Sequence, residues 1–290
     1  MLFGGIEAGG TKMVCAVVDE KGKIFDRISF PTTLPEENIA YMVKYFKGFD
    51  IKGLGIGSFG PLDLNPLSVK YGSITRTPKA GWDFVNFVKP FEEALRIPVG
   101  IDTDVNAAIY GEVCFGAAQG LDCAIYITVG TGIGVGVYAN GGLLHGLGHP
   151  EAGHILLIRH PKDTYEGCCR FHKACFEGLA SGPALQARWG KPAAELYHRA
   201  EVWDLEAYYI AQAITNYILS YAPQKIILWG GVMHNPNLLE LVNLQVKQNI
   251  NGYLDLPENY IVRPQLGENP GIIGAAQLGY LAWQKKDVNS

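Results

Sequence analysis

The chain has 290 residues, of which 48% are hydrophobic and 18% charged, so it can bury a full core and is long enough for about two domains. Its formal charge of -4 and the lack of any run of Lys or Arg argue against nucleic acid as a partner. No apolar run approaches the length of a membrane span and no signal-peptide pattern opens the chain, so we expect a cytoplasmic protein with reduced thiols and no membrane partner.

Residues 2–24 and 123–144 show the same order of segments. Each has an apolar run, a turn rich in Gly and Thr, a second apolar run and then a polar turn. In the later segment the polar turn is Asn140-Gly141, a strong hairpin signal. The chain is therefore predicted to contain two related halves, each opening with a glycine-tipped hairpin.

Strands and helices alternate after each hairpin. In the first half, helices are predicted at 35–48, 84–96 and 105–118, with a buried strand at 53–59 and a strand that ends in Asp at 99–104. In the second half, helices are predicted at 179–189, 205–222, 237–250 and 271–283, with a buried strand at 225–231. This alternation indicates an α/β protein, and we place the domains at 1–117 and 118–290.

The two Gly-Thr turns are candidate phosphate sites. Such a turn exposes backbone N–H groups, lets another group approach closely and offers a hydroxyl. The first candidate comprises Gly9, Gly10, Thr11 and Lys12, and the second Gly130, Thr131, Gly132 and Gly134. A plain hairpin turn remains the alternative for each. The spacing Gly55-x-Gly57-x-x-Gly60 fits a dinucleotide fingerprint, but Pro61 follows and no helix is predicted to open there.

Asp104 is the candidate general base. It lies in the sequence Asp-Thr-Asp-Val-Asn, just past a predicted strand and at the start of a helix. A carboxylate there can accept the proton of a substrate hydroxyl, the one proton transfer that phosphoryl transfer to an alcohol requires. Asp is equally suited to be a helix N-cap, and Asp102 and Asn106 compete for either role.

The segment Gly167–Gly178 contains three of the six cysteines. Cys169-x-x-His172-x-x-Cys175, together with His154 upstream, offers thiolate and imidazole ligands at spacings that suit tetrahedral zinc. Cys168 is an alternative to Cys169. A disulfide, inert buried cysteines and a catalytic Cys-His pair are the competing interpretations. Four protein ligands would make the site structural.

Glu151, His154 and Glu177 flank this segment. Carboxylates and an imidazole beside a fixed loop can hydrogen-bond sugar hydroxyls. The alternative for each acid is a solvated surface position.

Nine motifs together resemble the ROK family of sugar kinases and repressors, most closely its bacterial fructokinase branch. They are GGIEAGGTK, GSFGPLD, TPKAGW, DTDVNAA, TVGTGIGVGV, HPEAGH, CxxHxxCFEGLASGPA, LWGGV and NPGIIGAA, and they extend along almost the whole chain. The resemblance implies a two-domain actin-like ATPase fold, which is ribonuclease H-like, with ATP and the sugar meeting in an interdomain cleft. Family repressors carry an additional DNA-binding domain, and we expect none here.

The resemblance also implies roles for individual residues. Asp104 would be the base; Gly9, Gly10, Thr11, Lys12, Thr131, Gly132 and Gly134 would bind phosphate; Gly230, Gly231 and Gly271 would lie on the adenosine side; Gly60, Thr103, Asp104, Glu151, His154 and Glu177 would face the sugar; and His154, Cys169, His172 and Cys175 would bind a structural Zn²⁺. ATP with Mg²⁺ and a homodimer are implied as well.

Three departures from the wider family disfavour glucose as the substrate. Glu7 stands where most members have Asp, Thr103 stands where many glucokinase-like members have Asn, and the cysteine-only metal motif is CxxHxxC here. The expected activity is therefore ATP-dependent phosphorylation of the 6-hydroxyl of D-fructose. Mannose, glucose or an N-acetyl hexosamine as acceptor, or an inactive sugar-sensing protein, are the alternatives.

Overall fold

The structure is a computed structural model that describes residues 1–77 and 79–288. The chain divides into two compact units. Unit 1 comprises residues 1–120, 142–150 and the chain from 265 onward, and unit 2 comprises 121–141 and 151–264. The predicted ranges 1–117 and 118–290 differ from these units, because the chain returns twice to unit 1. Within the described part of the chain, no helix is both long and apolar enough to span a membrane.

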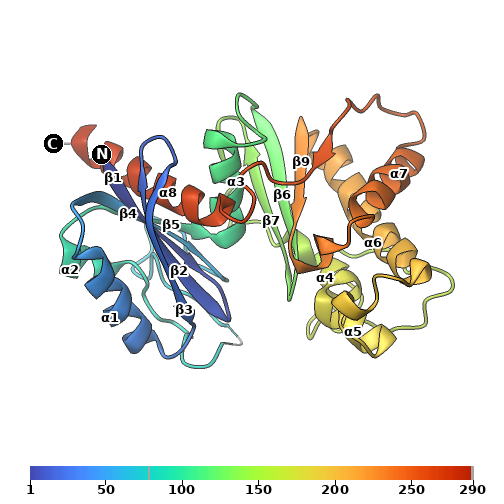
Figure 1. Ribbon diagram of the computed structural model, residues 1–290, viewed down its shortest axis with the longest axis horizontal. Helices are drawn as coiled ribbons and strands as arrows, with labels where there is room; N and C mark the ends of the chain where they lie inside the picture. The colour runs from blue at the N-terminus through green and yellow to red at the C-terminus, as the bar shows by residue number, and fades with distance from the viewer. Residues whose placement is uncertain (78, 289–290) are drawn as a thin grey trace. The chain divides into compact units, whose positions relative to one another are not determined.

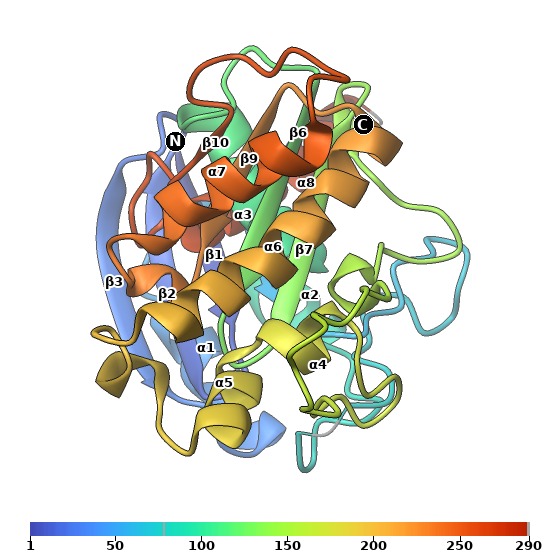
Figure 2. The ribbon, with the colours of Figure 1, turned by 90° about the vertical axis from the view of Figure 1, so that its right-hand side faces the viewer.

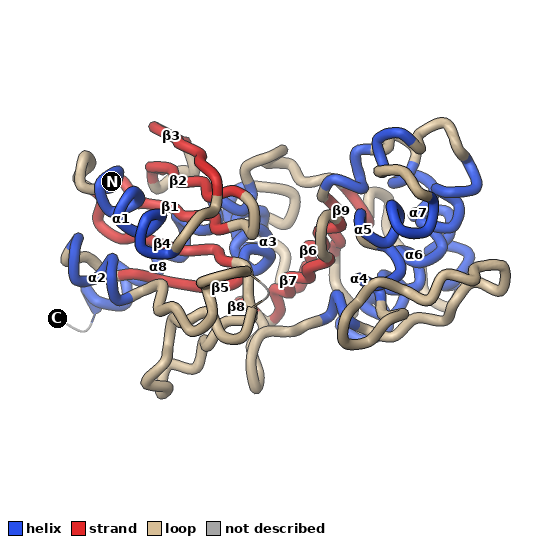
Figure 3. The backbone as a smooth tube through the Cα atoms, turned by 90° about the horizontal axis from the view of Figure 1, so that it is seen from below, coloured by secondary structure: helices blue, strands red, loops and turns tan. Residues whose placement is uncertain are grey.

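Unit 1 is built on a five-stranded sheet in the order β3-β2-β1-β4-β5 (Figure 3). The strands are β1 Leu2–Ala8, β2 Lys12–Asp19, β3 Ile24–Pro31, β4 Ile51–Ser58 and β5 Val99–Thr103. β2 is antiparallel to both β1 and β3, whereas β1, β4 and β5 are parallel to one another. The helices are α1 Pro35–Phe46, α2 Lys89–Leu95, α3 Asp104–Phe115 and α8 Pro270–Val288.

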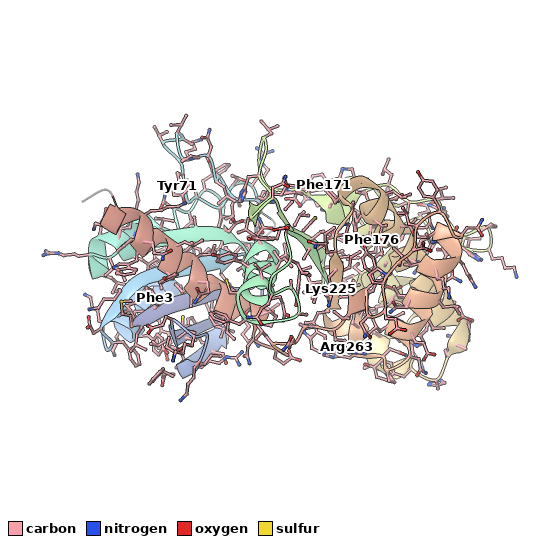
Figure 4. All side chains as sticks on the ribbon, turned by 90° about the horizontal axis from the view of Figure 1, so that it is seen from above. Phe3, Tyr71, Phe171, Phe176, Lys225 and Arg263 are labelled. Atoms are coloured by element: carbon pink, nitrogen blue, oxygen red, sulfur yellow. The ribbon has the colours of Figure 1, made fainter. Side chains whose placement is uncertain are left out.

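Each face of this sheet carries a hydrophobic cluster, and the residues of β1 and β2 are divided between the two clusters. On β2, Cys15 packs in the cluster that includes Met42 of α1, whereas Ala16 packs in the cluster that includes Ile272 of α8. In Figure 1, α1 and α2 accordingly lie on one side of the sheet and α8 on the other. Figure 4 labels Phe3 of β1, which belongs to the α8 side and is fully buried.

Glycines on β4 let the backbone of α8 approach the sheet closely. A Cβ atom on Gly55 would lie 1.8 Å from the carbonyl oxygen of Ala275, and one on Gly53 would lie 2.4 Å from that of Gly279. Gly57 serves helix packing as well, since a Cβ atom there would lie 2.7 Å from the Cβ of Ala107 on α3. As expected, no helix opens directly after Gly60, and the described residues 59–77 and 79–88 belong to no named helix or strand.

Unit 2 repeats the topology of unit 1. Its sheet has the order β10-β9-β6-β7-β8, which read from β8 is the same arrangement as β3-β2-β1-β4-β5. The strands are β6 Cys123–Val129, β7 Ile133–Ala139, β9 Lys225–Trp229 and β10 Ile261–Val262, with the two-residue edge strand β8 Gly142–Leu143, which belongs to the 142–150 part of unit 1. Asn140 and Gly141 have φ of 53° and 79° in the β7–β8 turn, as a type I′ hairpin requires. The prediction of two related halves is thus confirmed.

The helices of unit 2 are α4 Phe176–Ala180, α5 Gly182–Trp189, α6 Ala200–Tyr221 and α7 Leu238–Ile250. Short 3-10 turns, η1 to η3, lie at Ala152–His154, Ala193–Glu195 and Gly231–His234. Figure 2 shows α6 and α7 packed side by side over the β6–β9 region of the sheet.

Two predicted helices are shorter or broken. The helix predicted at 84–96 begins only at Lys89, because the Asn86 side chain accepts the N–H groups of Val88 and Lys89 and holds the chain in a turn before it. The helix predicted at 179–189 is divided at Ser181. The Ser181 hydroxyl accepts the N–H of Ala184 and so starts α5 as a separate helix.

Candidate active site and metal centre

The first glycine turn joins β1 to β2 and is braced by the end of β3. The N–H of Gly9 donates to the carbonyl of Lys12 at 3.0 Å, and the Thr32 hydroxyl donates to the carbonyl of Gly9 at 2.7 Å. The N–H of Thr32 donates to the carbonyl of Thr11 at 3.0 Å. Gly10, Thr11 and Lys12 are exposed at the tip. The turn is therefore held in shape from behind while its tip stays accessible.

Glu7 lies at the base of this turn, near the end of β1. Burial, followed by the charge of Asp104, raises the pKa of the Glu7 carboxyl to about 7, while Arg27 and Lys12 act in the opposite direction. Gly271, at the start of α8, packs against it, since a Cβ atom there would lie 2.9 Å from the Glu7 carboxyl carbon. Unit 1 thus brings together the first phosphate candidate, Gly271 and Asp104.

Asp104 is the first residue of α3, and Thr103 is the N-cap. The Thr103 hydroxyl accepts the N–H of Asn106 at 3.1 Å, and the Asp104 carboxylate accepts the N–H of Val105 at 2.9 Å. The alternative role of Asp104 as N-cap is therefore wrong. Asp102 does not compete for the base role either, because its carboxylate is buried among hydrogen-bond donors within unit 1.

One of those donors was missed by sequence reasoning. His145 Nε2 lies 2.9 Å from Asp102 Oδ2. Four residues later, His149 Nε2 accepts the N–H of Leu62 at 3.3 Å, beside Gly60. The sequence HGLGH carries two histidines next to the HPEAGH motif, which is a signal that could have drawn attention to them.

The second glycine turn, in unit 2, joins β6 to β7 and gathers several predicted site residues. The N–H of Gly130 donates to the carbonyl of Gly132 at 2.9 Å, and the carbonyl of Gly130 accepts the N–H of Gly182 at 2.8 Å. A Cβ atom on Gly130 would lie 4.0 Å from the nitrogen of Gly231. Ile133, the first residue of β7, donates its N–H to Glu177 Oε2 at 3.0 Å. Thr131 is at the exposed tip, and Gly134 lies within β7.

Glu177 therefore contacts the second glycine turn from the first turn of α4. Glu151 is exposed and precedes η1, where its carbonyl accepts the N–H of His154 at 3.0 Å. The backbone of η1 packs closely on β7, because a Cβ atom on Gly153 would lie 1.9 Å from the carbonyl oxygen of Ile133. The 151–154 and 175–177 segments thus meet at the start of β7.

The four predicted metal ligands lie in one cluster. The candidate ligand atoms of His154, Cys169, His172 and Cys175 all lie within 4.8 Å of one another. His154 Nδ1 is 3.5 Å from Cys175 Sγ and 3.7 Å from Cys169 Sγ, and His172 Nδ1 is 3.8 Å from Cys169 Sγ. Zinc bonds of about 2.3 Å to sulfur and 2.1 Å to nitrogen give a tetrahedron with edges of roughly 3.4–3.8 Å. The donor set and its spacing therefore fit zinc.

Cys168 lies outside this cluster. It is exposed, and its sulfur is 3.7 Å from the Ser181 hydroxyl oxygen. Phe171, between Cys169 and Cys175, is 72% exposed, whereas Phe176, which follows Cys175, is fully buried (Figure 4). The cluster is therefore anchored where α4 begins, whereas its side near Phe171 is exposed.

A pocket of about 1150 Å³ in unit 2 was not predicted. It lies along α7, the start of α6 and the loop before β10, with Trp203, Glu240 and Tyr260 in its lining. Asn235, which directly follows the 3-10 turn that begins at Gly231, also lines it.

Two sheets of one topology, each with a glycine-tipped hairpin at its centre, define an actin-like ATPase fold. The model of the ROK family matches residues 3–280, and the chain belongs to that family.

Similar proteins cover the chain almost completely. A Bacillus subtilis (strain 168) protein is 54% identical over 98% of this chain and 97% of its own. The fructokinase of Lactococcus lactis subsp. cremoris is 46% identical over 97% of both chains. The ROK hexokinase of Thermus thermophilus has a similar structure, with a TM-score of 0.83, 28% identity and coverage of 99% of this chain and 100% of that one. A ROK family glucokinase from Streptomyces griseus, in complex with glucose and AMPPNP, has a TM-score of 0.77, 26% identity and coverage of 97% and 100%.

Proposed function

We propose that this chain is a fructokinase, which transfers the γ-phosphoryl group of ATP to the 6-hydroxyl of D-fructose. The observation that carries the proposal is the 46% identity, over nearly the whole of both chains, to a protein named fructokinase. The position of Asp104 supports it. Because β5 ends at Thr103 and α3 begins at Asp104, both elements fix the backbone of Asp104. Its carboxylate can therefore face a bound substrate in one orientation.

In this proposal Asp104 accepts the proton of the 6-hydroxyl as its oxygen attacks the γ-phosphorus. Thr103, Gly60, Glu151, His154 and Glu177 would orient the sugar. Backbone N–H groups at the two glycine turns, 9–12 and 130–134, would bind the phosphate oxygens and stabilise the charge on the transferring group. Gly230, Gly231 and Gly271 would flank the adenosine, and the pocket that Asn235 lines would accommodate the base.

Mg²⁺ fits the carboxylates of unit 1. Hard cations prefer oxygen ligands, and the Glu7 carboxyl lies close enough to Asp104 for that charge to raise its pKa. When bound, Mg²⁺ would offset the negative charge of the ATP phosphates. Glu7 would hold it through water.

We propose a structural zinc ion at His154, Cys169, His172 and Cys175. With four protein ligands no position is left for a substrate, so the ion would order the loop and not take part in the reaction. Because Cys175 is followed two residues later by Glu177, an ordered cluster would also fix the carboxylate that holds the second glycine turn.

The test is an assay of ADP release with fructose, mannose, glucose and N-acetyl hexosamines as acceptors. Fructose is expected to give the highest kcat/KM. Asp104→Asn should keep fructose binding while kcat falls by roughly 100-fold or more. Asp50→Asn, at an exposed acid, is the matched control and should keep full turnover.

Two outcomes would contradict this proposal. Near-normal turnover in Asp104→Asn would exclude Asp104 as the base. Sugar binding without ATP turnover in the wild-type protein would favour a sugar-sensing role.

The proposal also includes a cytoplasmic homodimer, which rests on the family resemblance. Light scattering should then give twice the chain mass of 31.6 kDa. A monomeric mass at assay concentrations would exclude the dimer.

A further inference from the structure

The turn that carries Asp104 is tied to a buried carboxylate. Asp102, the fourth residue of β5, accepts the N–H of Thr103 at 2.8 Å and the side-chain amide of Asn106 at 2.7 Å, both on Oδ1. Thr103 directly precedes Asp104, and Asn106 lies two residues after it. The conformation of the backbone at Asp104 therefore depends on where the Asp102 carboxylate is held.

The other oxygen of Asp102 is bound by His145. The distance from His145 Nε2 to Asp102 Oδ2 is 2.9 Å, and the Asp102 side chain is only 5% exposed. A buried carboxylate is costly unless a positive charge and hydrogen bonds compensate it. When protonated, His145 supplies that charge from a segment 43 positions further along the chain.

The segment that carries His145 is itself fixed to unit 1. Leu143 packs against the cluster formed by Ala107, Ala275 and Leu278, and His149 accepts the N–H of Leu62. Residues 143–149 are thus anchored before and after His145. The His145 imidazole is held by this backbone and by its contact with Asp102, although 38% of the side chain is exposed.

We propose that His145 is a positioning residue for the general base: its ion pair with Asp102 holds the β5–α3 turn so that the Asp104 carboxylate is aimed at the acceptor hydroxyl. This inference rests on the proposed kinase function. It assigns His145 no contact with substrate. Its effect on turnover is transmitted by the hydrogen bonds from Asp102 to Thr103 and Asn106.

The charge on His145 responds to pH. The hydrogen bond to Asp102 raises the pKa of His145, and a backbone hydrogen bond at Leu143 acts in the same direction, while burial opposes both. Titratable groups on the elements around the pair are Asp102, Asp104, Tyr110, His149 and Tyr71, and the Asp102 charge contributes to the raised pKa of Tyr71. The imidazolium is present below the pKa of His145 and is lost as the pH rises through it.

The experiment compares three variants in the ADP-release assay across a pH series. His145→Ala should lower kcat by about 10- to 100-fold with little change in KM for ATP, because a small displacement of the base is costly. His145→Gln keeps a hydrogen-bond donor without the charge. Its kcat should therefore lie between those of the wild type and His145→Ala. We expect kcat of the wild type to decline as His145 loses its proton, and this decline should be absent from His145→Gln. Leu147→Ala, on the same segment and with a fully exposed side chain, is the matched control and should keep that decline.

NMR titration of the histidine rings gives a readout that does not depend on turnover. Asp102→Asn should bring the pKa of His145 down towards its ordinary value. A His145→Gln enzyme with wild-type kcat and pH profile would overturn the proposal, as would a His145 pKa unchanged by Asp102→Asn. If the wild type phosphorylates no hexose, the proposed function fails instead, and the titration still reports whether the ion pair exists.

Discussion

Glu112 on α3 accepts the backbone N–H of Leu266 at 2.9 Å, although 154 residues separate the two. The same carboxylate accepts the N–H groups of Ala117 at 2.6 Å and Gln265 at 3.1 Å. These three residues lie where the chain is about to leave unit 1 and where it has just returned. The buried Glu112 side chain therefore fixes both chain segments, at 117 and at 265–266, within unit 1.

Replacing this carboxylate should be costly. In Glu112→Gln an amide donor would face backbone donors, and at least one buried N–H would lose its acceptor, so unfolding should need about 2–3 kcal/mol less. Urea titration measures this. Glu201→Gln, at an exposed acid paired with Arg199, is the control and should leave stability close to that of the wild type. Equal effects for the two variants would contradict the role of Glu112.

Glu206 should make stability depend on pH. Burial raises the pKa of its carboxyl well above the ordinary value, and Arg188 acts only partly against this. The unfolded chain ionises Glu206 near pH 4.5 whereas the folded chain keeps the proton, so the stability it contributes is lost as the pH rises above that value.

Glu206→Gln removes this titration. We expect its melting temperature relative to the wild type to rise between pH 5 and pH 8, with pH 5 as the internal control. A variant less stable than the wild type at pH 8 would mean instead that Glu206 is ionised and paired with Arg188.

Gly55→Ala should disturb the contact between β4 and α8. The added methyl would lie 1.8 Å from the carbonyl oxygen of Ala275, so the helix must move, at a cost of about 3 kcal/mol or more. Gly142→Ala, where nothing lies within 4 Å of the added atom, is the control. Thermal unfolding of both variants measures the difference, and equal melting temperatures would rule out this close packing.

Purified protein should contain about one equivalent of zinc. Cys169→Ser and Cys175→Ser should each lose most of it and unfold at lower temperature, because a thiolate ligand is gone. Cys168→Ser is the matched control, since that sulfur lies beside Ser181 outside the cluster. Metal analysis that finds zinc lost from Cys168→Ser but kept in Cys169→Ser would reverse the ligand assignment.

The β1–β2, β6–β7 and β7–β8 hairpins were predictable because their tight turns favour glycine. Gly-Thr between two apolar runs and Asn140-Gly141 specify turns within a few residues, whereas the order of the parallel strands beyond each hairpin was not predicted. The metal cluster was predictable for a similar reason, since three of its ligands lie within seven residues. Its fourth, His154, was reached only by its proximity in the sequence.

Features that depend on distant partners were not predictable from local patterns. The break at Ser181 is decided by a side-chain cap within an apolar helical pattern. The pair of His145 and Asp102 needs a segment to return to a sheet formed much earlier in the chain. The apolar spacing at 271–283 indicated a helix, but not that its partner would be β4.

The packing of α8 on the first sheet has a consequence for biosynthesis. The ribosome releases β1 to β5 long before it releases the helix that covers their glycine-rich face, so that face stays open while all of unit 2 is being made. Unit 1 can reach its final form only after translation has passed residue 288, and a nascent chain stalled before α8 should be recognised by chaperones that bind exposed apolar surface.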